Sequence, residues 1–80
     1  MRENLLKFIR RCLITKKPDL HSFVVEIENG RSFVDCQFGE VNIFTIFYGD
    51  PETKELFTGS ADEAADYLIK NGMKWETIEQ

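Results

Sequence analysis

The sequence contains few of the residues that build covalent scaffolds and metal sites. It has two cysteines, one histidine and two prolines among 80 residues. Two isolated cysteines are too few for a disulfide-stapled fold, and no Cys-x-x-Cys or Cys/His spacing of a zinc site occurs. We therefore expect Cys12 and Cys36 to be buried thiols on core-facing sides of their elements, and we expect no bound metal or cofactor.

Catalytic motifs are also missing. His21 is the only histidine, and no serine or cysteine stands at a spacing that would make it a partner in nucleophilic catalysis. The glycines fall at expected turns and helix ends and not in a phosphate-binding motif. The acids between residues 52 and 66 do not follow the spacing of a calcium-binding loop. The sequence therefore predicts a protein that is not an enzyme.

The chain has no long hydrophobic run. Lys7, Arg10 and Arg11 interrupt the apolar segment 5–14, so neither a signal peptide nor a membrane span of about 20 residues can be assembled. With few cysteines, this favours a cytoplasmic protein with no membrane role. The content of 42% hydrophobic residues, including seven Phe, is that of a globular protein, and the length predicts one domain over residues 1–80 with a thin core.

Charge is divided unevenly along the chain. Residues 1–17 carry six Lys and Arg against one acid, a net charge of +5, while residues 18–80 carry four against thirteen, a net charge of −9. The periodicity predicts an amphipathic helix over 3–15 that ends before Pro18, with an apolar side and an opposite basic side. The basic side is either solvated, paired with the protein's own acids, or a candidate polyanion contact made of Lys7, Arg10, Arg11, Lys16 and Lys17.

Two tight turns predict an antiparallel meander. Asn29-Gly30 favours a two-residue turn between strands at 23–28 and 31–38, which places Val25 opposite Val34 and Glu28 opposite Arg31. Gly39-Glu40 favours a second turn to a strand beginning at residue 41, which places Cys36 opposite Ile43. We take the pairing of Val25 with Val34 as the test of which side chains share a face, and we expect that any other partner for Val25 would remove the proposed interface.

The last third of the sequence predicts a further strand and a helix. Asp50-Pro51-Glu52-Thr53 is typical of a turn, and residues 54–58 could return as a short fourth strand, with Leu56 beside Phe47. Ser60 and Glu63 have the spacing of a capping box, and Asn71-Gly72 is a helix stop. Met73, Trp75 and Ile78 resemble packing residues of unassigned location.

Together these elements predict an α+β fold, a helix followed by three or four antiparallel strands and a second helix. In the predicted register one face of the sheet is apolar and receives the helices. The other face is more aromatic than a solvent-exposed face should be, so we expect it to be covered by the chain itself, by a second copy in a homodimer, or by a partner. Its candidate interface residues are Phe33, Phe44, Ile46, Tyr48 and Phe57.

These features favour a small, acidic, non-enzymatic module that binds protein through this aromatic face. One alternative is a protein that binds nucleic acid through the basic helix, although nucleic acid is a less favoured partner than protein. The other alternative is an acidic protein that mimics nucleic acid.

Overall fold

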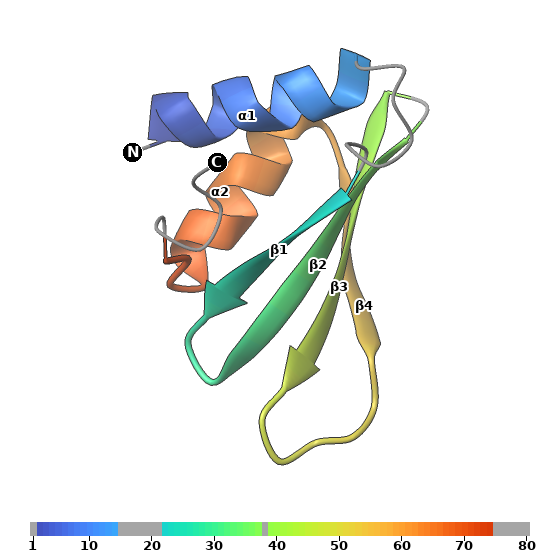
Figure 1. Cartoon of the computed structure of the whole chain (residues 1–80), viewed down its shortest axis with the longest axis vertical. Coiled ribbons are helices and arrows are strands. Elements are labelled where there is room, and N and C mark those ends of the chain that lie inside the picture. The colour runs from blue at the N-terminus through green and yellow to red at the C-terminus, as the bar shows by residue number, and fades with distance from the viewer. Residues whose placement is uncertain (1, 15–21, 38, 75–80) are drawn as a thin grey trace.

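The elements follow the predicted order, and the fourth strand is present. The computed structural model describes residues 2–14, 22–37 and 39–74. The four strands form one open antiparallel sheet in the order β1-β2-β3-β4, and both helices lie on the same face of it (Figure 1). The fold is therefore α+β. The elements are α1 (Arg2–Ile14), β1 (Ser22–Ile27), β2 (Gly30–Gln37), β3 (Glu40–Phe47), β4 (Lys54–Gly59) and α2 (Ala61–Lys70).

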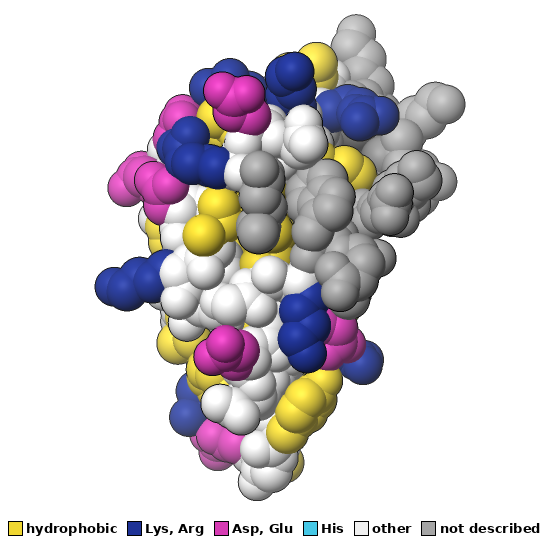
Figure 2. All heavy atoms as spheres, turned by 90° about the vertical axis from the view of Figure 1, so that its left-hand side faces the viewer, with side chains coloured by type: hydrophobic (Ala, Val, Ile, Leu, Met, Phe, Trp, Pro, Cys, Tyr) yellow, Lys and Arg dark blue, Asp and Glu magenta, His cyan; other side chains and the backbone are white. Residues whose placement is uncertain are grey.

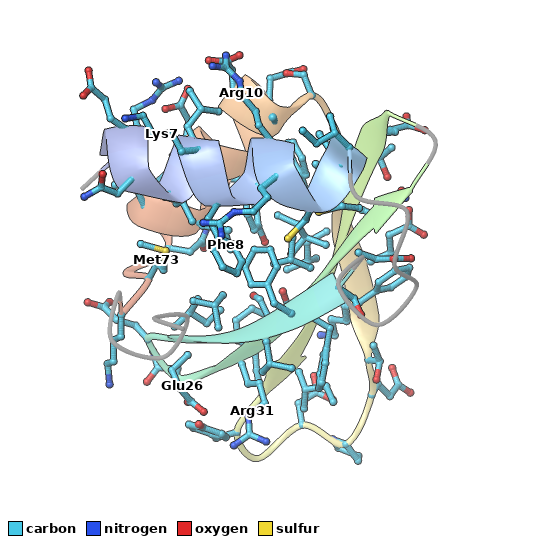
Figure 3. The ribbon with its side chains drawn as sticks, turned by 45° about the horizontal axis from the view of Figure 1, so that its top comes forward. Lys7, Phe8, Arg10, Glu26, Arg31 and Met73 are labelled. Carbon is cyan, nitrogen blue, oxygen red and sulfur yellow. The ribbon has the colours of Figure 1, made fainter. Side chains whose placement is uncertain are left out.

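The core lies between the helices and the sheet. Leu5 and Ile9, one helical turn apart on α1, are fully buried, and Phe8 of the same helix meets Phe23 of β1 edge to face with ring centroids 4.9 Å apart. Figure 3 shows Phe8 and Met73 between α1 and the sheet. The buried apolar residues are Leu5, Leu6, Ile9, Cys12, Val25, Ile27, Val34, Cys36, Val41, Ile43, Ala61, Ala64, Ala65, Leu68 and Met73.

The capping box of α2 is confirmed. The amide of Glu63 donates to the Ser60 hydroxyl oxygen at 3.3 Å, and the amide of Ser60 donates to the Glu63 carboxylate at 3.2 Å. The predicted stop is also present, since Gly72 has a positive φ of 78° directly after Asn71. The helix therefore begins and ends where local side-chain and backbone chemistry allows.

The predicted register of both hairpins is wrong by two residues. Val25 pairs with Ser32 and not with Val34, and Arg31 pairs with Glu26 and not with Glu28. Cys36 likewise pairs with Val41 and not with Ile43. Because side chains alternate with a period of two, a shift by two residues keeps every side chain on its predicted face. The predicted partner of Val25 is therefore wrong, but the predicted faces of β1, β2 and β3 are kept. Only a shift of the register by an odd number of residues would have exchanged the two faces of the sheet.

Gly30 explains the displaced first turn. It is the first residue of β2, and a Cβ atom there would lie 2.4 Å from the backbone oxygen of Ile46 in β3. The glycine therefore serves a close approach of two strands, while the positive φ of the turn, 64°, falls on Asn29.

A bulge in β4 overturns the predicted positions of two side chains. Ile43 pairs with Phe57, but the next residue, Phe44, pairs with Glu55, so Leu56 is an extra residue opposite β3. Leu56 was expected on the core face beside Phe47 but is 42% exposed. Phe57 was expected on the opposite face but packs against the core.

The outer edge of β1 is partly occupied by the residues that follow α2. The amide of Glu28 donates to the carbonyl of Asn71 at 3.3 Å, and the amide of Lys74 donates to the carbonyl of Glu26 at 3.0 Å. Met73, between them, is buried as expected for a packing residue. Trp75 and Ile78 lie outside the described residues, as does Phe38.

Candidate interaction surfaces

The face of the sheet that points away from the helices is called the second face here. Its centre is a row of three apolar side chains, Val24, Phe33 and Phe44, which are direct cross-strand partners on β1, β2 and β3. Val24 is 42% exposed, while the two phenylalanines are partly buried among their neighbours. Ile46, two residues beyond Phe44 on β3, extends the apolar area. Neither α1 nor α2 covers this row, because both lie on the opposite face (Figure 1).

A polar cluster holds Tyr48 beside this row. The Tyr48 hydroxyl donates to one carboxylate oxygen of Glu26 at 2.6 Å, and Arg31 contacts the other oxygen through Nε at 3.2 Å and Nη2 at 3.1 Å. Figure 3 shows Glu26 and Arg31 on the side of the sheet away from α1. The ring of Tyr48, 63% exposed, is therefore fixed at its hydroxyl end, which lowers the entropy that a contact with it would cost.

The same hydrogen bond shifts both pKa values. The hydrogen bond from the Tyr48 hydroxyl has the largest effect on the pKa of Glu26, and it lowers that pKa. Burial raises the pKa of Glu26 and the charge of Arg31 lowers it, so the net result is a lowered pKa. Accepting that bond favours the charged carboxylate, while donating it favours the neutral phenol, so the pKa of Tyr48 is raised. Sequence reasoning missed this cluster because it paired Arg31 with Glu28.

Phe57 does not belong to the second face. Its ring stacks on Tyr67 of α2 with centroids 5.4 Å apart and an interplanar angle of 29°. The bulge at Leu56 reverses the alternation of β4, so Phe57 faces the helices. Of the residues predicted for an interface, Phe33, Phe44, Ile46 and Tyr48 therefore share the second face, and Phe57 does not. A shallow hollow lies at the Tyr48 end of β3. It is lined by Ile46, Phe47, Tyr48, Gly49, Asp50 and Pro51.

The basic side of α1 is paired in part with the acids of α2. Arg2 contacts Asp66 at 2.6 Å and Asp62 at 3.3 Å, and Arg10 contacts Asp62 at 3.4 Å. Figure 2 shows Lys and Arg side chains beside Asp and Glu side chains at the end of the molecule where α1 lies. Arg2 was not singled out by sequence reasoning, although its Asp66 bond is the shortest of these three contacts.

The remaining predicted cations are arranged differently. Arg11 lies over the ring of Phe8, 5.8 Å from its centroid, in a cation–π contact. Lys7 is exposed and points away from the sheet (Figure 3), and it makes no ion pair with any residue that the structure describes. Lys16 and Lys17 lie outside the described residues, as does His21.

Both thiols are buried, as predicted. Cys12 and Cys36 are 7% and 1% exposed. Within residues 2–14, 22–37 and 39–74, no three His, Cys, Asp or Glu side chains converge as possible metal ligands. None of the helices in the described ranges is long and apolar enough to cross a membrane. Comparisons of the chain with protein-family models, curated proteins and solved structures gave no match.

Proposed function

We propose that this chain is a small non-enzymatic module that binds protein through the second face of its sheet. The observation that supports this most is the row of Val24, Phe33 and Phe44, which neither α1 nor α2 covers, with Tyr48 fixed beside it by Glu26. Apolar and aromatic side chains at the centre of a patch are the usual source of binding energy in protein interfaces.

Acidic residues next to the row give the proposed interface its selectivity. Asp35 follows Phe33 by two residues on the same face of β2, and Glu55 pairs with Phe44 across β3 and β4. Carboxylates in these positions repel acidic partners and attract basic ones. The proposed occupant is another protein or a second copy of this chain in a homodimer, and the two are distinguished by experiment. The sequence also offered the tail with Trp75 as a cover for this face, and that tail lies outside the described residues.

The first experiment tests whether the face is available in solution. The monomer is expected to bind a dye that fluoresces on apolar surfaces, and Val24→Asp combined with Tyr48→Ala is expected to reduce this binding. Ile14→Asp is the matched control, because Ile14 is 79% exposed on α1, away from the second face. A monomer that binds no dye would contradict the proposal.

The second experiment identifies the occupant. Sedimentation over a range of concentrations shows whether the protein self-associates, and capture from the native host shows which protein it retains. Both the Val24→Asp/Tyr48→Ala variant and the Ile14→Asp control are carried through each measurement, with far-UV circular dichroism to verify folding. Association that survives in the double variant would place the interface elsewhere.

Nucleic-acid binding through α1 is the alternative. Its support is reduced because Arg2 and Arg10 are already paired with acids of α2, although Lys7 and Arg11 remain exposed. Binding to phosphates alone would be weak and would fall steeply with salt. Charge reversal at Lys7 and Arg11 should abolish retention on duplex DNA if this alternative holds, and should leave protein capture unchanged if the second face is the interface. If the chain instead mimics nucleic acid and binds a basic protein, charge reversal at Lys7 and Arg11 should leave that binding unchanged.

A further inference from the structure

The second face carries negative charge beside its apolar row. Glu55 pairs with Phe44 across β3 and β4, and Glu40 begins β3 on the same side of the sheet. The Thr58 hydroxyl lies 3.0 Å from Glu55 Oε1 and 2.9 Å from Asn42 Oδ1, which keeps the Glu55 carboxylate on this side. Glu40 and Glu55 are exposed, and neither makes an ion pair with any described residue. A partner on this face therefore meets carboxylates that no described cation neutralises.

The described strands offer no spare cation to a second copy of this face. They contain two Lys or Arg residues. Arg31 lies on the second face and is bound to Glu26 at 3.1 Å, and Lys54 is bound to Asp50 at 2.9 Å. Docking of two identical faces would therefore bring acids together without neutralising them, which is unfavourable. The charges favour a partner that itself brings Lys or Arg.

The apolar side chains of the second face also form a column along β3 and just beyond it. Phe44, Ile46 and Tyr48 alternate with residues that face the core, so they project from the same side of the chain. Four residues of strand span about 14 Å, a length that about nine residues of α-helix cover. The hollow beside Tyr48 continues the column at its end, and β4 with Glu55 borders it on one side.

A helix is the element that fits this column. An extended peptide laid on the face would place its backbone N–H and C=O groups against apolar side chains, and unpaired polar groups are costly to bury. The sheet edges are poor sources of the missing bonds, because residues 71–74 hydrogen-bond to β1 and the bulge at Leu56 interrupts β4. A helix pairs its own backbone and can pack on a sheet face, as α1 and α2 do on the other side (Figure 1).

We propose that the second face binds an amphipathic helix of another protein, and that this helix carries Lys or Arg on the flank that lies over Glu55. Its apolar side packs on Phe44, Ile46 and Tyr48, so the sheet becomes the middle of three layers. The long stems of Lys and Arg cover apolar surface while their charged ends reach the carboxylate. This inference rests on the protein-binding function proposed above and specifies the partner.

The partner class is tested with three synthetic peptides of about 15 residues, long enough for an isolated helix to form in part. The first has Leu along one side and Lys elsewhere, the second has Glu in place of every Lys, and the third has the composition of the first in an order that gives no Leu side. Each peptide is titrated into the isotope-labelled full chain, and the amide signals are followed by NMR. The first peptide should shift the signals of residues 44–48 and should bind at least about tenfold more tightly than the other two.

The other outcomes separate this inference from the proposed function. Equal binding of the Lys and Glu peptides would overturn the basic helix, and equal binding of the third peptide would overturn the amphipathic one. If none of the peptides binds, the helical partner is refuted, while the proposed function still stands when the dye and a captured protein bind the second face. Self-association that is lost in Val24→Asp/Tyr48→Ala would replace the helix by a second copy of the chain.

Variants of Glu55 locate the charge contact. Glu55→Lys should weaken binding of the Lys peptide about two- to tenfold at about 0.15 M salt, because it replaces an attraction between exposed charges with a repulsion. Glu55→Gln retains the size of the side chain and should give a smaller loss.

Glu3→Lys is the matched control, because Glu3 is exposed on α1 on the other side of the sheet and undergoes the same change of charge. Its binding of the Lys peptide should equal that of the wild type, and far-UV circular dichroism verifies that each variant is folded. Equal losses in Glu55→Lys and Glu3→Lys would overturn the inference, because attraction by net charge would then explain the binding.

Discussion

A buried pair of hydroxyls at the centre of the sheet allows a quantitative test of the structure. Ser32 and Thr45 are cross-strand partners on β2 and β3, both are fully buried, and their oxygens are 3.0 Å apart. Thr45→Val preserves the shape of the side chain but removes the hydroxyl, so Ser32 loses this partner. A buried polar group left without a partner costs about 1–3 kcal/mol, and Ser32→Ala should cost a similar amount.

The double variant distinguishes this reasoning from a simple loss of packing. Removing both hydroxyls leaves no unpaired group, so Ser32→Ala/Thr45→Val should be less destabilising than the sum of the two single changes, by about 1–2 kcal/mol. Urea unfolding followed by far-UV circular dichroism measures all four proteins, and each single change should lower the midpoint by about 1–2 M. Single effects that add to within about 0.5 kcal/mol would refute the reasoning and the β2–β3 register with it.

Two further predictions concern the first hairpin, the second turn and the polar cluster. Gly30→Ala should destabilise the fold by about 3 kcal/mol, because the added Cβ would collide with the backbone of β3. Gly39→Ala should cost only about 1–2 kcal/mol, because its Cβ meets no other atom and only the positive φ of 76° is strained. Equal urea midpoints for the two variants would contradict this reasoning. The pKa of Glu26 is below its ordinary value of 4.5, so its contribution to stability is complete above that pH and is lost as the pH falls through the lowered value. Tyr48→Phe removes the main cause of the shift and should flatten the loss of stability below pH 4.5, as measured by urea unfolding on both sides of that pH; an unchanged profile would show that the hydroxyl does not stabilise the carboxylate.

The sequence predicted the elements and faces better than the register. Periodicity and the capping box depend on neighbouring residues, so the helices were found close to their observed ends. Asn29-Gly30 was interpreted as a turn pair, but Gly30 is required where β2 approaches the backbone of Ile46 on β3. That contact is tertiary and leaves no local signal in the sequence.

The candidate site was predicted in part for the same reason. Phe33, Phe44, Ile46 and Tyr48 follow the alternation of regular strands and share the predicted face. Phe57 lies beyond a bulge, and one extra residue reverses every later side chain of a strand. The ion pairs of Arg2 depend on how α1 crosses α2, which neither helix specifies alone.

Both edges of the sheet are partly obstructed against the addition of a further strand. Residues Asn71–Lys74 hydrogen-bond to the outer edge of β1, and the bulge at Leu56 and the charged pair Lys54 and Glu55 interrupt β4. Irregular and charged edges prevent a foreign strand from docking in register, which is how fibrils and swapped dimers are seeded. We therefore expect a partner to be recognised through side chains on the second face more readily than through backbone hydrogen bonds to an edge strand.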